Sequence, residues 1–138
     1  MEEIIKKLKD LAESHLGTAE NKEAIIERIK LLKSNNIAPP PIEYLNIIHK
    51  INGIRTAFAC FYGCINKKNG VLLDIVEENM RYNLEDKSEI IVLGHNPIEY
   101  LVYNNKEKFY ETRDIITNEH TSSFNNIQTA ISYFFDLY

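Results

Sequence analysis

Residues 89–113, EIIVLGHNPIEYLVYNNKEKFYETR, decide the fold class of this chain. Three short apolar runs are separated by two clusters of turn-forming residues, Gly94–Pro97 and Asn104–Asn105. Connections this short join antiparallel neighbours, because a parallel crossover needs about a dozen residues or more. The stretch therefore predicts an antiparallel meander. Its strands are expected at 89–93, 98–103 and 108–113.

The segment before the meander predicts one more strand and one helix. Thr56–Tyr62 is short, rich in aromatic residues and bounded by glycines, which is typical of a strand. Asn69–Gly70 indicates a turn. Asp74–Leu84 has apolar residues at helical spacing and many acidic ones between them. The side chains expected to point inward are Ile75, Val76, Met80 and Leu84.

The N-terminal part of the chain has the apolar spacing of helices. Glycine and proline set the expected boundaries, since Gly17 can end the first helix and Pro41 can begin the third. Residues 37–41 should be extended because proline disfavours helix at the residue before it. Helices are predicted at 2–16, from a cap at Thr18 or Asn21 to 33, and at 41–51, where Tyr44 faces inward.

A last helix closes the predicted fold. Asn125-x-x-Gln128 resembles a capping box. The inward positions of this helix are Ile127, Ile131, Phe134 and Phe135. Helices followed by strands and a closing helix favour the α+β class over a parallel α/β sheet. We therefore expect one domain over residues 1–138, with an antiparallel or mixed sheet of about four to six strands flanked by helices.

Composition places the chain among ordinary globular proteins. It has 138 residues, of which 44% are hydrophobic and 26% charged, and only two cysteines. No apolar run approaches the ~20 residues that span a bilayer. The N-terminus, MEEIIKKLKD, mixes charges into its apolar positions, unlike a secretory signal. A cytoplasmic protein without membrane attachment is the expectation.

Negative charge is concentrated in the C-terminal half. The formal net charge is −4, and residues 74–91 carry six acids against Arg81 and Lys87. Such a surface repels phosphate backbones, so nucleic acid is not an expected partner. A basic protein fits it better.

Neither a metal site nor a nucleophile is evident in the sequence. Cys60 and Cys64 lack the two further ligands of a zinc site, so they are interpreted as core thiols. The four histidines are separate, and Gly-x-Ser-x-Gly, phosphate-binding and dinucleotide-binding motifs are absent from the sequence. No cofactor is expected. A Cys–His pair formed by folding stays open.

The acidic segment admits three interpretations. It can be a solvated helix face, a docking surface or an acid–base site. Tyr100 and Tyr103 fall on opposite faces of one strand, so at least one should lie at a rim. A docking surface would use Asp74, Glu77, Glu78, Glu85 and Asp86, together with His95, Asn96 and Tyr100 of the predicted hairpin.

Several segments in order resemble the SUKH superfamily, particularly its YrhA-like branch. The matching motifs lie in the central helix, the strand after it, the hairpin and the closing helix. They are Pro41-x-x-Tyr44-Leu45, Asn52-Gly53, Phe61-Tyr62-Gly63, Leu93-Gly94, the strand 99–104, and Phe124 with Ile131–Phe135. The chain departs from the family pattern at His95-Asn96-Pro97 and in its cysteine pair.

The resemblance implies an α+β fold without enzymatic activity. Many bacterial members of the superfamily are similar to immunity proteins that neutralise toxins by direct binding, and eukaryotic relatives resemble adaptors. It supplies no catalytic residues. We therefore expect a non-catalytic module that binds a basic toxin domain. A small enzyme with a Cys/His or carboxylate site, or a structural or adaptor domain, remains the alternative, and the oligomeric state is left open.

Overall fold

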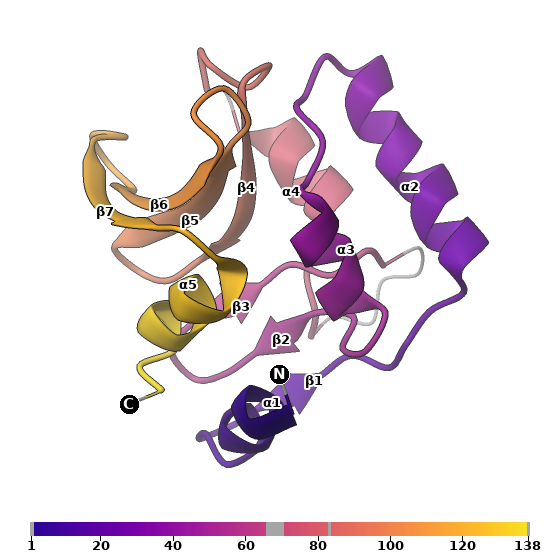
Figure 1. Cartoon of the computed structure of the whole chain (residues 1–138), viewed down its shortest axis with the longest axis vertical. Coiled ribbons are helices and arrows are strands. Elements are labelled where there is room, and N and C mark those ends of the chain that lie inside the picture. Colours follow the sequence, from indigo (N-terminus) through magenta and orange to yellow (C-terminus); the bar gives the residue numbers. More distant parts are fainter. Residues whose placement is uncertain (1, 66–70, 83, 138) are drawn as a thin grey trace.

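An antiparallel sheet organises the chain, as seen in a computed structural model that describes residues 2–65, 71–82 and 84–137 (Figure 1). Within these residues the sheet has seven strands in the order β1-β2-β3-β4-β5-β6-β7, and every neighbouring pair is antiparallel. The predicted α+β class is confirmed, whereas the expected four to six strands were too few.

Helices and strands are more interleaved along the chain than predicted. The helices are α1 (Glu2–Lys9), α2 (Lys22–Ser34), α3 (Ile42–Ile48), α4 (Ile75–Arg81) and α5 (Ile127–Phe134). The strands are β1 (His15–Leu16), β2 (Ile54–Arg55), β3 (Cys60–Phe61), β4 (Ile90–His95), β5 (Glu99–Asn104), β6 (Phe109–Asp114) and β7 (His120–Phe124). Thus β1 lies between α1 and α2, and α4 lies between β3 and β4.

The predicted meander is confirmed in β4, β5 and β6, with boundaries shifted by one or two residues. Gly94 and His95 were predicted in a turn but belong to β4. Glycine is needed at position 94 because a Cβ there would lie 2.3 Å from the carbonyl oxygen of Cys60, on the neighbouring strand. Sequence patterning did not predict β7, whose side chains are mostly polar.

The strand predicted at 56–62 is confirmed only at Cys60–Phe61 (β3), because residues 56–59 form a turn between β2 and β3. The Thr56 hydroxyl accepts hydrogen bonds from the backbone N–H groups of Phe58 (3.2 Å) and Ala59 (3.1 Å). Threonine competes in this way with the strand ladder and closes a tight hairpin.

The first helix is shorter than predicted and ends at Lys9, and His15–Leu16 pair with β2 instead. Gly17 lies directly against the chain after α3, where a Cβ would meet the carbonyl oxygen of Asn52 at 1.9 Å. This close approach needs glycine and holds the segment extended. The turn predicted at Asn69–Gly70 lies outside the described residues.

The structure confirms two of the three helix starts predicted from the sequence. Asn21 caps α2, as one of the two predicted candidates. Pro41 precedes the first residue of α3. For α5 the cap is Asn126, whose side chain accepts from the N–H of Thr129, so the predicted cap at Asn125 was one residue early.

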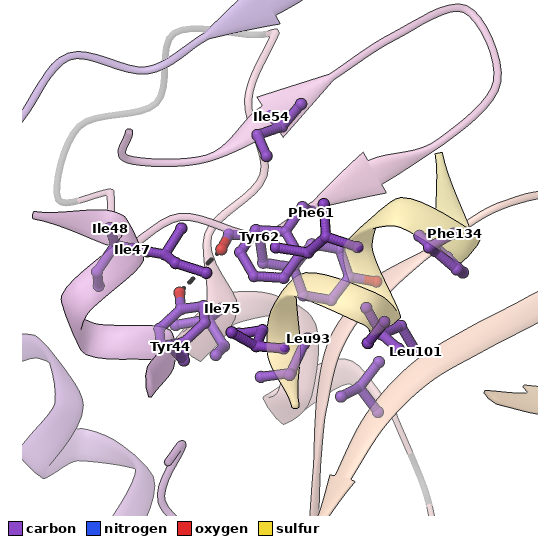
Figure 2. Close-up of a cluster of buried hydrophobic side chains, with 14 of the residues drawn as sticks. Tyr44, Ile47, Ile48, Ile54, Phe61, Tyr62, Ile75, Leu93, Leu101 and Phe134 are labelled. Carbon is purple, nitrogen blue, oxygen red and sulfur yellow. Dashed lines mark hydrogen bonds between the residues drawn. The ribbon is translucent and has the colours of Figure 1, made fainter. Parts of the chain in front are cut away.

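Helices lie on both faces of the sheet (Figure 1). Tyr82, just after α4, contacts Tyr100 on one face, while Tyr133 of α5 contacts Phe124 on the other. The core lies between α3, α4, α5 and the central strands, and Figure 2 shows a part of it. There the buried Tyr44 donates its hydroxyl to the carbonyl oxygen of Tyr62 at 2.8 Å, which confirms the core prediction for this tyrosine.

Among the described residues, no helix has both the length and the apolar character needed to cross a bilayer.

Ile48 gives a direct test of the core (Figure 2). It is fully buried at the end of α3, so Ile48→Ala should lower the free energy of unfolding by about 2–5 kcal/mol in urea denaturation. Ile42→Ala, at the exposed start of the same helix, should change it by less than about 0.5 kcal/mol. Equal effects of the two substitutions would contradict the burial of this helix face.

Candidate functional site

Asp74 is the N-cap residue of α4, and the contacts of its side chain stabilise the fold. Its carboxylate accepts from the N–H groups of Glu77 (2.9 Å) and Ile65 (2.8 Å) and pairs with Arg28 of α2 at 2.8 Å. Only 3% of its side chain is exposed. Asp74 therefore caps the helix and joins α2 to α4, and it offers little surface to a partner.

The orientation predicted for α4 is wrong in two places. Glu78 was expected to face solvent, but it is buried and pairs with Arg81 at 3.1 Å. Met80 was expected in the core, yet it is 54% exposed. Ile75 and Val76 are buried as predicted. The helix is thus rotated relative to the prediction, because Asn79 points inward and bonds the backbone of Val92 through both its amide nitrogen and oxygen.

A hollow of about 410 Å³ lies beside the first turn of α4. Three of the predicted acidic residues, Asp74, Glu77 and Glu78, meet there, and Asp74 and Glu78 pair with Arg28 and Arg81. Its described lining residues are Ile65, Leu72, Leu73, Asp74, Glu77, Glu78 and Arg81. An acid-lined hollow of this kind favours a cationic group.

Glu85 and Asp86, after α4, have different roles. Glu85 is exposed, as predicted. Asp86 instead accepts from Arg113 of β6 at 2.9 Å. The same guanidinium also contacts Glu111, whose side chain is 4% exposed. The five predicted acids therefore do not form one continuous acidic face, since Asp86, whose side chain is 34% exposed, belongs to an ion cluster with the buried Glu111 and Arg113.

At the β4–β5 hairpin, the structure brings His95 and Tyr100 into one aromatic cluster. His95 Nδ1 lies 2.6 Å from the Tyr62 hydroxyl, which also contacts the hydroxyl of Tyr82. The ring of Tyr82 meets Tyr100 edge to face, with centroids 5.0 Å apart. Burial lowers the pKa of His95 below its usual value, so the imidazole is neutral at pH 7.

Asn96, the third predicted hairpin residue, is buried and shapes the turn. Its side-chain oxygen accepts from the N–H groups of Ile98 (2.9 Å) and Glu99 (2.8 Å). Tyr100 and Tyr103 are both half-buried on opposite faces, as the spacing predicted.

A hydrogen-bonded series of three side chains was not predicted from the sequence. The Ser123 hydroxyl lies 3.0 Å from His120 Nε2, and His120 Nδ1 lies 2.9 Å from a carboxylate oxygen of Glu111. A nucleophile, a base and an orienting acid follow one another in this order in serine hydrolases. The series is formed by the pairing of β6 with β7, where Glu111 faces Ser123, so only knowledge of β7 could have revealed it.

Both cysteines are buried, which confirms the core-thiol interpretation of their placement. Burial raises the pKa of the Cys60 thiol, and it raises that of Cys64 to about 12. Within residues 2–65, 71–82 and 84–137, no group of three or more His, Cys, Asp or Glu side chains is arranged to hold a metal ion.

The rate of cysteine alkylation tests whether burial protects the two thiols. With the pKa of Cys64 raised from 9.0 to about 12, its thiolate fraction at neutral pH falls roughly a thousandfold. Iodoacetamide at pH 7.5 should therefore modify the native chain far more slowly than the urea-unfolded chain, as followed by mass spectrometry. Equal rates would contradict the burial of the two thiols.

Comparison with models of protein families and with curated proteins found no match for this chain.

Proposed function

We propose that this chain is a non-catalytic binding module of the SUKH type that neutralises a basic toxin in the cytoplasm by direct contact. The observation that carries the proposal is the acid-lined hollow at α4. Glu77 and Glu78 line it together with Asp74, whose side chain is 3% exposed and pairs with Arg28. Arg81, which pairs with Glu78, is the cation among its described lining residues.

The size and charge of the hollow suit a side chain of a partner protein. About 410 Å³ lies within the range of natural binding pockets, ~300–1,000 Å³. An acidic recess attracts a Lys or Arg side chain and repels a phosphate. Toxins that act on nucleic acids need basic surfaces for their own substrates, so an acidic inhibitor competes with the substrate for the same surface.

The state of the thiols supports binding over thiol catalysis. A catalytic cysteine needs a lowered pKa, whereas burial raises the pKa of both Cys60 and Cys64. His95 is engaged with Tyr62, and its lowered pKa comes mainly from burial. These groups stabilise a core in preference to activating a nucleophile.

Affinity capture tests the proposal. The tagged chain, incubated with native lysate of its source organism, should retain one basic protein in stoichiometric amount. The purified pair should then show loss of that protein's toxic activity at a one-to-one ratio. Recovery of an acidic or metabolic protein, with no activity suppressed, would contradict the proposal.

A second candidate function is ester or amide hydrolysis by Ser123, favoured by its contact with His120. The side chain of His120 is 48% exposed, and Glu111 already shares its charge with Arg113, so the imidazole has a weakened orienting acid. Hydrolysis of p-nitrophenyl acetate by the native chain and by Ser123→Ala separates the candidates. A turnover lost in the variant would favour the enzyme, and equal background rates would favour the binding module.

A further inference from the structure

Three hairpin turns of the sheet are built in the same way. In each, a polar side chain at the start of the turn accepts hydrogen bonds from the backbone N–H groups two and three residues later. Thr56 does so in the β2–β3 turn, Asn96 in the β4–β5 turn and Asp114 in the β6–β7 turn. In an antiparallel sheet with this strand order, these three turns lie at the same end.

The residue two positions after each capping side chain is large, apolar and exposed. Phe58 is 56% exposed, Ile98 is 62% exposed and Ile116 is 90% exposed. Single exposed apolar residues are common on protein surfaces. Here three lie at equivalent positions of three turns at one end of the sheet, and we call them together the tip surface: Phe58, Ile98 and Ile116.

The turn geometry does not require an apolar residue at this position. The β5–β6 turn, at the opposite end of the sheet, has the same construction, with Asn104 accepting from Lys106 (3.0 Å) and Glu107 (2.9 Å). There the equivalent position is Lys106. The turn construction alone therefore does not account for the apolar residues at the other three turns.

The three turns adjoin one another. A hollow of about 180 Å³ is lined by both the β2–β3 turn and the β4–β5 turn, including Phe58 and Pro97. The N–H of Ile115 donates to the carbonyl oxygen of Ile98 at 2.9 Å, which joins the other two turns. With neighbouring strands ~4.8 Å apart, the tip surface spans roughly 20 Å. These turns lie at the left of Figure 1, with the β5–β6 turn at its top.

The charges of the hairpin turns differ. The three turns (residues 56–59, 96–99 and 114–119) carry Glu99, Asp114 and Glu119 and no Lys or Arg, although Arg55 lines the hollow beside Phe58. The β5–β6 turn (residues 105–108) carries Lys106 and Lys108 against Glu107. The tip surface is thus apolar with an acidic rim, the complement of an apolar segment flanked by basic residues.

We propose that the tip surface is the docking site for a protein segment whose apolar side chains are flanked by Lys or Arg. The proposal rests on the proposed function and adds to it the surface that anchors the partner. Phe58, at one end of the row of turns, lines both the 180 Å³ hollow and a second one of about 280 Å³, so it is the principal anchor. Aromatic anchors beside recesses dominate binding energy at protein interfaces.

A defined peptide tests the surface without the toxin. The probe is Lys-Lys-Leu-Phe-Leu-Lys-Lys, blocked at both ends, titrated into the ¹⁵N-labelled chain by NMR. Saturable amide shifts are expected within 57–59, 98–99 and 115–117. A peptide with serines at its three apolar positions, and one with glutamates for its lysines, should each bind about tenfold more weakly or worse.

Matched variants complete the test. A triple variant, Phe58→Ser with Ile98→Ser and Ile116→Ser, should unfold at the temperature of the parent and bind the peptide about tenfold more weakly or worse. Lys106→Ser, at the equivalent position of the opposite turn, should bind like the parent.

Three results would overturn the docking site: shifts centred on α4, equal binding by the triple variant, or shifts that depend on the chain's own concentration without peptide. The first two place the contact elsewhere, and the third assigns the patch to a second copy. Because no toxin is used, these failures leave the proposed function standing. Conversely, peptide binding without any captured toxin would refute only that function.

Discussion

Arg113→Met is expected to lower the free energy of unfolding by about 3–5 kcal/mol. The Arg113 guanidinium bridges Asp86 and Glu111, and the Glu111 side chain is 4% exposed. Removing the cation leaves a buried carboxylate with only the half-exposed His120 beside it. Because an unpaired buried charge costs more than a missing pair, the loss should far exceed that of a surface ion pair.

A double variant separates charge from packing. Arg113→Met combined with Glu111→Gln removes both charges and should recover most of the lost stability, as read from urea denaturation midpoints. Lys30→Met, which breaks an exposed ion pair with Glu27, serves as the surface control and should cost at most about 1 kcal/mol. If Arg113→Met costs no more than this control, the ion cluster does not exist as described.

Reversing acids around α4 should slow association with a basic partner about tenfold or more at low salt. The positions are Glu85 and Glu89, which are exposed, and Glu77, which is half-buried, each changed to Lys. Glu78 and Asp86 are excluded because their ion pairs with Arg81 and Arg113 support the fold. Stopped-flow measurements across ionic strength should show the difference shrinking as salt screens the charges.

The control for this prediction changes the net charge equally at a different place. Glu2, Glu3 and Glu23, at the starts of α1 and α2, are exposed and can be reversed together. This variant should associate at nearly the parental rate. Equal slowing by both variants would show that only net charge matters, and no slowing by either would make the acidic segment a solvated face.

Much of the fold could be predicted because local patterns were strong. The strands β4 to β6 alternate with clear turn residues, and α2 and α3 have a capping asparagine and an opening proline. Patterns were weak where elements are short or polar. β1, β2 and β3 have two residues each, and the polar β7 is defined by its pairing with β6.

The candidate site was harder to predict, since the surroundings of a charge depend on distant residues. Asp86 looked like a solvent-facing acid until the structure placed Arg113, 27 residues away, beside it, whereas Glu78 pairs with its near neighbour Arg81. The apolar residues of the tip surface come from three separate turns, Phe58 among them, and only the strand order brings these turns to one end. The spacing of residues along the sequence does not show which turns lie at the same end of the sheet.

The decisive measurement is a direct binding titration. The chain is titrated against the purified protein encoded by the reading frame immediately upstream of its own gene. Calorimetry should show one-to-one binding with nanomolar affinity, and the toxic activity of that product should fall to zero at equimolar chain. Absence of heat on mixing, with the activity unchanged at excess chain, would contradict the proposal that this protein neutralises a toxin by direct binding.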